Sequence, residues 1–196
     1  PDSKQIAIDG NEKGIWIYSI GGSETGQPLP NAEGECHSLT WSPDSQSIAF
    51  FNDSHCLIVS SPDGKVTRLK VPLKTEGRDL GWSPDGKRFA YSDDSIHILD
   101  TALKEARKLD TDDESAKGLA WSPNGKLLAY RANCPLLKVF DIEQMRPLSE
   151  ISCKKNGRYH FHWSPDSKYL AITGAAYEIV ISEVQTGKIV GSKLFD

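Results

Sequence analysis

The sequence lacks the long apolar segments and the basic balance that mark two large classes of protein. No run approaches the roughly 18 apolar residues of a membrane-spanning helix, and no charged-then-apolar signal segment opens the chain. The 196 residues include 23 Lys and Arg against 27 Asp and Glu, a net charge of −4. Because nucleic-acid-binding domains are usually basic, we expect neither a membrane protein nor a dedicated nucleic-acid binder.

Cysteine is also scarce. The chain has four cysteines, and none stands in the C-x-x-C spacing of zinc and redox sites. We expect reduced thiols in a cytoplasmic protein, with a disulfide or a metal-binding set as the alternative. The four residues are Cys36, Cys56, Cys134 and Cys153.

The short motifs of common catalytic and nucleotide-binding sites are missing as well. No G-x-S-x-G elbow occurs, and the glycines are scattered through turns rather than gathered in a phosphate-binding loop. Asp112-Asp113-Glu114 is followed by no EF-hand spacing, which favours a solvated acidic loop over a cation site. We therefore expect this segment to hold no catalytic residue, cofactor or metal ion.

What the sequence does contain is a repeat. Trp82-Ser83-Pro84-Asp85-Gly86-Lys87-Arg88-Phe89-Ala90-Tyr91 has close copies that begin at Trp41, Trp121 and Trp163. The chain opens at Pro1 inside a fifth copy, which indicates a piece of a longer protein. The repeat prolines Pro1, Pro43, Pro84, Pro123 and Pro165 are separated by steps of 42, 41, 39 and 42 residues. A period of about 40–45 residues is typical of β-propeller blades.

Each part of the motif has a physical role. Ser-Pro-Asp-Gly is the composition of a type I turn, with Pro presetting φ at its second position. The Trp and the following Ala then lie on two antiparallel strands joined by that turn. We expect Trp41, Trp82, Trp121 and Trp163 to be buried at equivalent places, each near its alanine. Those alanines are Ala49, Ala90, Ala129 and Ala171.

The predicted fold is all-β: one β-propeller segment over residues 1–196, with about five four-stranded antiparallel blades. The first blade lacks its innermost strand, and we expect the segment to belong to a larger propeller of six to eight blades, because an open sheet edge needs a partner. Innermost strands are expected at His37–Trp41, Arg78–Trp82, Lys117–Trp121 and Tyr159–Trp163. The predicted blades are residues 1–35, 36–73, 74–112, 113–153 and 154–196.

Leu137-Lys138-Val139-Phe140-Asp141-Ile142, followed by Pro147-Leu148, resembles the third and fourth strands of WD-repeat propellers. Trp-Ser-Pro-Asp-Gly-Lys-x-x-Ala-Tyr is equally similar to TolB-like propeller repeats. The resemblance covers the whole chain. A WD-repeat propeller implies a rigid platform that binds proteins or peptides.

His160-Phe161-His162 is the sharpest local pattern. Residues two apart in a strand share a face, so both imidazoles should point one way and Phe161 and Trp163 the other. A two-histidine metal or proton site is one interpretation. A polar pair at positions that hold small or polar residues in the other repeats is the favoured one.

The loops before each innermost strand should share one rim of the propeller. That rim is acidic after blade three and basic after blade four, which suits steering of a charged protein partner; ordinary charged surface loops are the equal alternative. The candidate partner-binding residues are Arg78, Asp112, Asp113, Glu114, Lys154, Lys155, Arg158 and His160.

The sequence thus predicts a non-catalytic, cytoplasmic propeller segment that acts as a protein–protein interaction scaffold within a larger protein. Two alternatives stay open. One is the propeller domain of a multidomain enzyme, such as a hydrolase, that gates or positions substrate. The other is a periplasmic TolB-like propeller that binds a partner. A common scaffold does not identify the partner.

Overall fold

The computed structural model describes most of the chain in short stretches. These are residues 2–10, 13–22, 25–30, 32–34, 36–52, 55–60, 64–69, 71, 79–93, 95–102, 106–109, 111, 116–132, 136–152, 160–173 and 178–194. All the regular structure in these stretches is β-strand and turn. In the same stretches, no helix of a length and hydropathy suited to crossing a membrane is present.

The chain divides into two compact units. The first comprises Pro1–Asp93 and Ile98–Arg107, and the second comprises Asp94–His97 and Lys108–Asp196. Each unit is built from small antiparallel sheets in which neighbouring strands follow one another along the chain.

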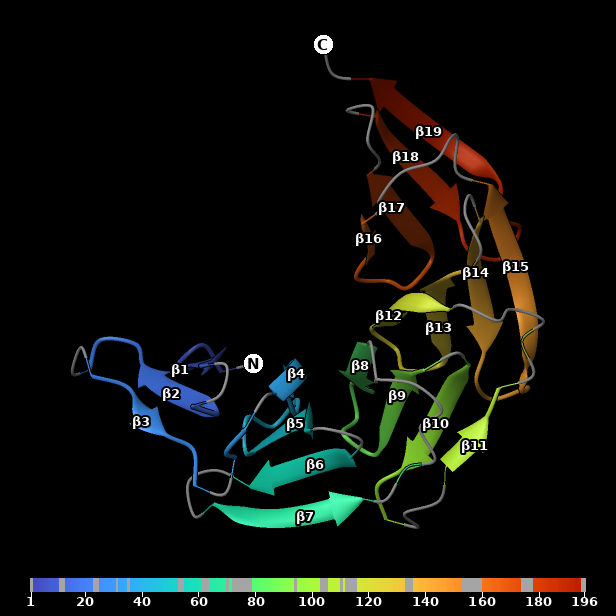
Figure 1. Ribbon diagram of the computed structural model, residues 1–196. Coiled ribbons are helices and arrows are strands. Elements are labelled where there is room, and N and C mark those ends of the chain that lie inside the picture. The colour runs from blue at the N-terminus through green and yellow to red at the C-terminus, as the bar shows by residue number, and fades with distance from the viewer. Residues whose placement is uncertain are drawn as a thin grey trace. The chain divides into compact units, whose positions relative to one another are not determined.

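The first unit holds one three-stranded sheet, one four-stranded sheet and most of a second four-stranded sheet (Figure 1). The three-stranded sheet, blade one, has the order β1 (Gln5–Asp9), β2 (Ile15–Ser19), β3 (Gln27–Pro28). Blade two has the order β4 (Cys36–Trp41), β5 (Ser47–Asn52), β6 (His55–Ser60), β7 (Lys65–Leu69). Blade three consists of β8 (Asp79–Trp82), β9 (Arg88–Ser92), β10 (Ile96–Asp100) and β11 (Ala106–Lys108).

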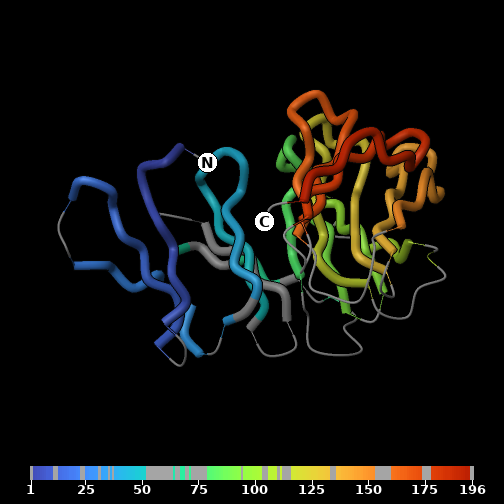
Figure 2. Tube along the Cα trace, turned by 90° about the horizontal axis from the view of Figure 1, so that it is seen from above, coloured from blue at the N-terminus to red at the C-terminus, as the bar shows by residue number. Residues whose placement is uncertain are grey.

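The second unit holds two further four-stranded sheets, in which the chain folds back at each turn (Figure 2). Blade four has the order β12 (Lys117–Trp121), β13 (Leu127–Arg131), β14 (Leu136–Asp141), β15 (Arg146–Ser152). Blade five has the order β16 (His160–Trp163), β17 (Tyr169–Thr173), β18 (Glu178–Glu183), β19 (Ile189–Leu194).

The prediction of an all-β chain of antiparallel four-stranded sheets is confirmed, and the arrangement is consistent with a propeller. The strands that end at the repeat tryptophans lie where the motif placed them: β12 spans Lys117–Trp121 as expected, and β4, β8 and β16 begin within one residue of the expected start. Pro28 and Pro147 lie in β3 and β15, the edge strands of their sheets. An edge strand tolerates proline because its outer N–H groups have no ladder partner.

The Ser-Pro-Asp turn is held by hydrogen bonds that its own side chains make. In blade three, Gly86 N donates to Ser83 O at 2.9 Å, which closes the turn. Ser83 Oγ donates to Asp85 Oδ1 at 2.6 Å and accepts from Arg88 N at 2.9 Å. Asp85 Oδ1 also accepts from Lys87 N at 3.1 Å. The buried serine and the aspartate therefore satisfy backbone groups that the hairpin alone would leave unpaired.

The same bonds recur in the other turns, and they shift the aspartates. The Ser42 hydroxyl, then the Gln46 N–H, lowers the pKa of Asp44 from 3.8. Asp166 behaves alike, with Ser164 as the leading cause of a lowered pKa. In blade four Asn124 takes the place of the aspartate, and its Oδ1 accepts from Ser122 Oγ at 2.8 Å and from Lys126 N at 3.0 Å.

Burial works against these bonds at Asp85. Desolvation is the largest single effect and raises the pKa of this carboxyl. The Ser83 hydroxyl, the Lys87 N–H and the charges of Arg88 and Lys87 lower the pKa, and their sum exceeds the effect of desolvation. The net result is a pKa below 3.8. Hydrogen bonding to the charged form outweighs partial burial here.

The fourth turn residue adopts a left-handed backbone, and in two turns it also connects blades. Ser45 and Ser167 both have φ of 61°, a conformation that costs energy for a residue with a Cβ. Ser45 Oγ accepts from Asp2 N at 3.0 Å, and Ser167 Oγ accepts from Asn124 N at 3.1 Å. Each serine thereby bonds to the turn of the preceding blade, which a glycine could not do.

The core lies between blades, where the faces of successive sheets meet. In the second unit, Leu127, Leu137 and Val139 of blade four pack with Leu170 and Ile172 of blade five. In the first unit, Ile48 and Phe50 of β5 pack with Ile15 of β2. A second cluster there joins Phe51 of β5 to Phe89 and Tyr91 of β9.

The repeat tryptophans are less buried than the sequence predicts. Ala49, Ala90 and Ala129 are fully buried, but Trp41, Trp82, Trp121 and Trp163 are only half-buried, as is Ala171. The four indoles do occupy equivalent places, because each ends the edge strand of its sheet. An edge strand is covered on one side only, so the ring keeps some exposure. The ring of Trp82 contacts that of Phe89, with centroids 3.9 Å apart and the two planes tilted by 43°.

The structure describes the side chain of one of the four cysteines. Cys36 is buried, and its Sγ donates to Gly34 O at 3.5 Å. Nothing is described of the side chains of Cys56, Cys134 and Cys153.

Candidate functional site

Most of the rim that the sequence singled out lies outside the described residues. His160 alone of the candidate residues is described, and its side chain is exposed. The segregation of charge along the rim therefore stays a prediction. The residues outside the described part are Arg78, Asp112, Asp113, Glu114, Lys154, Lys155 and Arg158.

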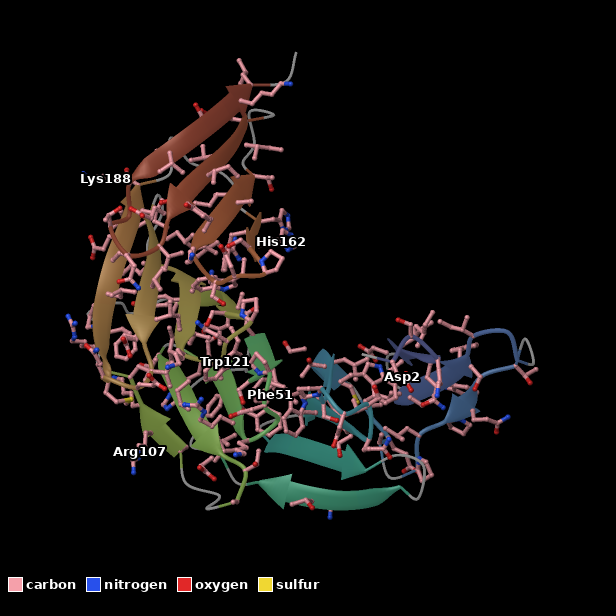
Figure 3. The ribbon with its side chains drawn as sticks, turned by 180° about the vertical axis from the view of Figure 1, so that it is seen from behind. Asp2, Phe51, Arg107, Trp121, His162 and Lys188 are labelled. Carbon is pink, nitrogen blue, oxygen red and sulfur yellow. The ribbon has the colours of Figure 1, made fainter. Side chains whose placement is uncertain are left out.

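His160 and His162 lie on β16, the edge strand of blade five. Figure 3 labels His162. Both histidines are exposed, whereas Phe161 and Trp163 are half-buried and pack against the core between blades four and five. The prediction that the two imidazoles share one face of the strand is confirmed. β16 is held against β17 in register, with His160 opposite Thr173.

The edge strand of blade four lies beside β16. Trp163 Nε1 donates to Ala120 O at 3.1 Å, a hydrogen bond from β16 to β12. One repeat step of 42 residues relates Gly118 to His160 and Ala120 to His162. Blade four thus carries two small residues at the positions where blade five carries two imidazoles.

The small residue Gly118 makes room for Arg131. Gly118 has φ of 64°, and a Cβ built on it would lie 2.8 Å from Arg131 Nε. The register of β12 with β13 shifts between Lys117 and Ala120, as a bulge does. Arg131 Nε is buried and has no hydrogen-bond partner among the described residues.

Sequence reasoning missed Arg131. The available signal was a glycine inside a predicted strand, which marks a bulge or a close approach of another group. Arg131 is the group that approaches Gly118. Its place depends on the pairing of Lys117 with Arg131 between β12 and β13, which the repeat alone does not specify.

We name four residues of these neighbouring strands the basic edge-strand surface: Lys117 and Arg131 of blade four, and His160 and His162 of β16. Lys117 and both histidines are exposed, and Arg131 is half-buried. The strands β12, β13 and β16 carry no Asp or Glu. Ammonium, guanidinium and imidazole groups donate hydrogen bonds to carboxylates. The surface is therefore suited to an anionic group, and its positive charge is not cancelled on its own strands.

A metal site is not assembled within the described residues. Across the described stretches, no group of three or more His, Cys, Asp and Glu side chains could hold a metal ion. His160 and His162 remain a pair of donors on one strand face, whereas zinc sites use three or four protein ligands.

The comparisons with known proteins give one family. The family described as "Eukaryotic translation initiation factor eIF2A" matches residues 46–184, more than two thirds of the chain. No curated protein matches the chain. The family is one of WD40-like β-propellers, which supports the WD-repeat resemblance at the level of the fold and gives no support to the TolB-like one. The all-β sheets and the matched region agree: this chain belongs to the eukaryotic translation initiation factor eIF2A family.

Proposed function

We propose that this chain is a non-catalytic interaction module of translation initiation, working in the cytoplasm, that docks an acidic segment of a partner protein on its basic edge-strand surface. The observation that carries the proposal is the exposure of His160 and His162 on β16, which is bonded to the strand that carries Lys117. The strands β12, β13 and β16 have no Asp or Glu. The family match supports the link to translation.

The propeller-like arrangement of the sheets supports the scaffold role. Five sheets repeat at steps of 39 to 42 residues and contribute equivalent turns and strands. We propose that they are blades of a larger propeller of six to eight blades. Such a scaffold holds its edge strands rigidly, which lowers the entropy cost of binding.

An acidic peptide fits the surface better than RNA does. The chain as a whole has a net charge of −4, so long-range electrostatics disfavour a long polyanion such as RNA more than a short run of carboxylates. Proteins that bind single-stranded RNA present aromatic faces for base stacking. Here Phe161 and Trp163 turn towards the core, and Trp163 Nε1 is bonded to the backbone of β12. A short run of carboxylates needs only the cationic groups.

The test is equilibrium binding of a fluorescently labelled, glutamate-rich peptide, followed by anisotropy at low salt. Replacing His160→Glu and His162→Glu together should weaken binding by at least about tenfold, since like charges then face the peptide. Arg131→Gln should weaken binding by a smaller factor.

The matched control is Lys168→Gln with Lys188→Gln. Counting histidine as neutral, it changes the net charge by the same amount, but at exposed positions of the turns of blade five. Peptide affinity should stay near that of the parent protein, and the melting temperature should confirm that every variant is folded. Equal weakening by the control, or tighter binding of a labelled single-stranded oligonucleotide than of the peptide, would reject the proposed surface or the proposed partner.

A further inference from the structure

Two hydrogen bonds cross the interface between blades four and five. Trp163 Nε1 on β16 donates to Ala120 O on β12 at 3.1 Å. In the turns that follow these two strands, Asn124 N donates to Ser167 Oγ at 3.1 Å. A hydrogen bond weakens steeply as its angle departs from linear. Both bonds therefore resist rotation of one blade against the other, in addition to the apolar packing between them.

The first of these bonds is missing between blades two and three. The repeat places Trp82 where blade five has Trp163, and it places Thr40 where blade four has Ala120. Trp82 Nε1 is buried, yet it has no hydrogen-bond partner among the described residues. A buried donor without a partner carries the full cost of its desolvation, which it recovers when it reaches water. The closed contact between blades two and three is therefore under a penalty at this atom.

The second bond is missing as well, because the turn of blade three has no hydroxyl at the position that makes it. Gly86 stands in the place of Ser167, and the equivalent donor in blade two is the N–H of Asp44. A Cβ built on Gly86 would lie 3.9 Å from Pro43 Cδ, an ordinary van der Waals distance. The two turns are thus neighbours with space for a serine, but within the described part of the chain no hydrogen bond joins them.

An apolar cluster joins blades two and three. Ala49 and Phe51 of β5 are buried together with Phe89 and Tyr91 of β9. The rings of Phe51 and Tyr91 meet edge to face, with centroids 6.2 Å apart and planes at 71°. Apolar attraction has no preferred direction. A small rotation about this cluster therefore costs less than the same rotation at an interface that is also hydrogen-bonded.

We infer that the interface between blades two and three is a hinge, which opens along the neighbouring strands β4 and β8 while the apolar cluster stays packed. Opening lets water reach the Trp82 N–H, so this interface opens at a lower free energy than the one between blades four and five. A partner that contacts both blades shifts the equilibrium to the closed state by its differential affinity. The hinge lies in the first unit and does not depend on the proposed peptide surface, which lies in the second.

The first readout is hydrogen exchange of the two indole N–H groups, followed by NMR. Trp82 Nε1–H should exchange at least about tenfold faster than Trp163 Nε1–H, and faster than the slowest backbone amides of the first unit. Exchange of the Trp82 group at the rate of those slowest amides would mean that the interface opens only when the whole unit unfolds. That result would overturn the inference.

The second readout tests whether the missing hydroxyl controls the opening. Gly86→Ser supplies an acceptor for Asp44 N, whereas Gly86→Ala adds the same Cβ at φ of 70° without an acceptor. Ser45, with φ of 61°, shows that serine adopts this backbone conformation in an equivalent turn. Both variants carry the same backbone strain, so their difference isolates the hydrogen bond. Trp82 exchange should be about threefold to tenfold slower in Gly86→Ser than in Gly86→Ala, with no difference at Trp163.

Ser167→Ala is the matched change at the other interface, because it removes the acceptor of Asn124 N and keeps the Cβ. Trp163 exchange should become about threefold to tenfold faster, and Trp82 exchange should not change. Equal Trp82 exchange in the two Gly86 variants, or unchanged Trp163 exchange in Ser167→Ala, would show that such a bond does not restrain a blade and would overturn the inference. Circular dichroism checks that the variants fold, and the comparison of the two indoles in the parent protein needs no variant.

Discussion

Two isoleucines at the same repeat position offer a controlled test of where the folding energy lies. Ile172 of β17 is 3% exposed in the core between blades four and five, and Ile8 of β1 is 49% exposed. Both pair with the next strand of their sheet in the same register. Replacing each in turn by alanine removes the same atoms from the same place in a blade, and only the covering of the face differs.

The expected costs follow from burial. An isoleucine-to-alanine change removes three carbon atoms, about 2.5 kcal/mol of transfer free energy when they are fully buried. Ile172→Ala should lose nearly all of this and a cavity term as well, giving about 3–4 kcal/mol. Ile8→Ala should lose about half of the transfer term and no cavity term, about 1 kcal/mol. The two costs should therefore differ by about 2–3 kcal/mol.

The assay is urea denaturation followed by tryptophan fluorescence and circular dichroism. The protein concentration must be low enough that sedimentation shows a monomer, since any association through this face would bury Ile8. Equal losses of unfolding free energy in the two variants would refute the assignment of Ile8 to an uncovered blade face. A larger loss in Ile8→Ala would refute the repeat equivalence itself.

Two further predictions concern the turns and the bulge. The lowered pKa values of Asp44, Asp85 and Asp166 mean that the turns contribute stability that is fully present above their ordinary pKa of 3.8 and is lost as the pH falls through the lower folded values. Urea midpoints measured from about pH 5 to about pH 2 should therefore fall less in the triple Asp→Asn variant, and an equal fall would contradict this source of acid sensitivity. Gly118→Ala should cost about 1–3 kcal/mol, because φ of 64° and contact with Arg131 Nε both disfavour a Cβ. A neutral effect on thermal unfolding would show that Arg131 moves aside freely.

The strands and turns could be predicted because their causes are local. Ser-Pro-Asp followed by Gly or Ser specifies a turn by backbone preference and by side-chain bonds within six residues. The alternation of apolar residues then sets the strands on both sides.

The remaining features depend on what lies across a blade face or beside an edge strand. The exposure of the tryptophans was misjudged because the sequence gives their apolar character but not the open side of an edge strand. Arg131 was missed because its place over Gly118 arises from a bulged register. Ile8 and Ile172 stand at the same repeat position and in the same strand register, and only the sheets around them make one exposed and the other buried.

The site could be predicted in part. The shared face of His160 and His162 follows from strand alternation, and the structure confirms it. The contribution of Lys117 and Arg131 depends on the approach of β12 to β16, which no local pattern contains.

The most direct test of the proposed docking surface is to map the bound peptide on the protein by NMR. Amide and imidazole shifts on adding the glutamate-rich peptide should be concentrated at Lys117, Gly118 and Arg131 and along β16 from His160 to Trp163. Saturable shifts at these positions are the result that the proposed function predicts. Shifts confined to the Ser-Pro-Asp turns, or no saturable shift at any peptide concentration, would contradict it.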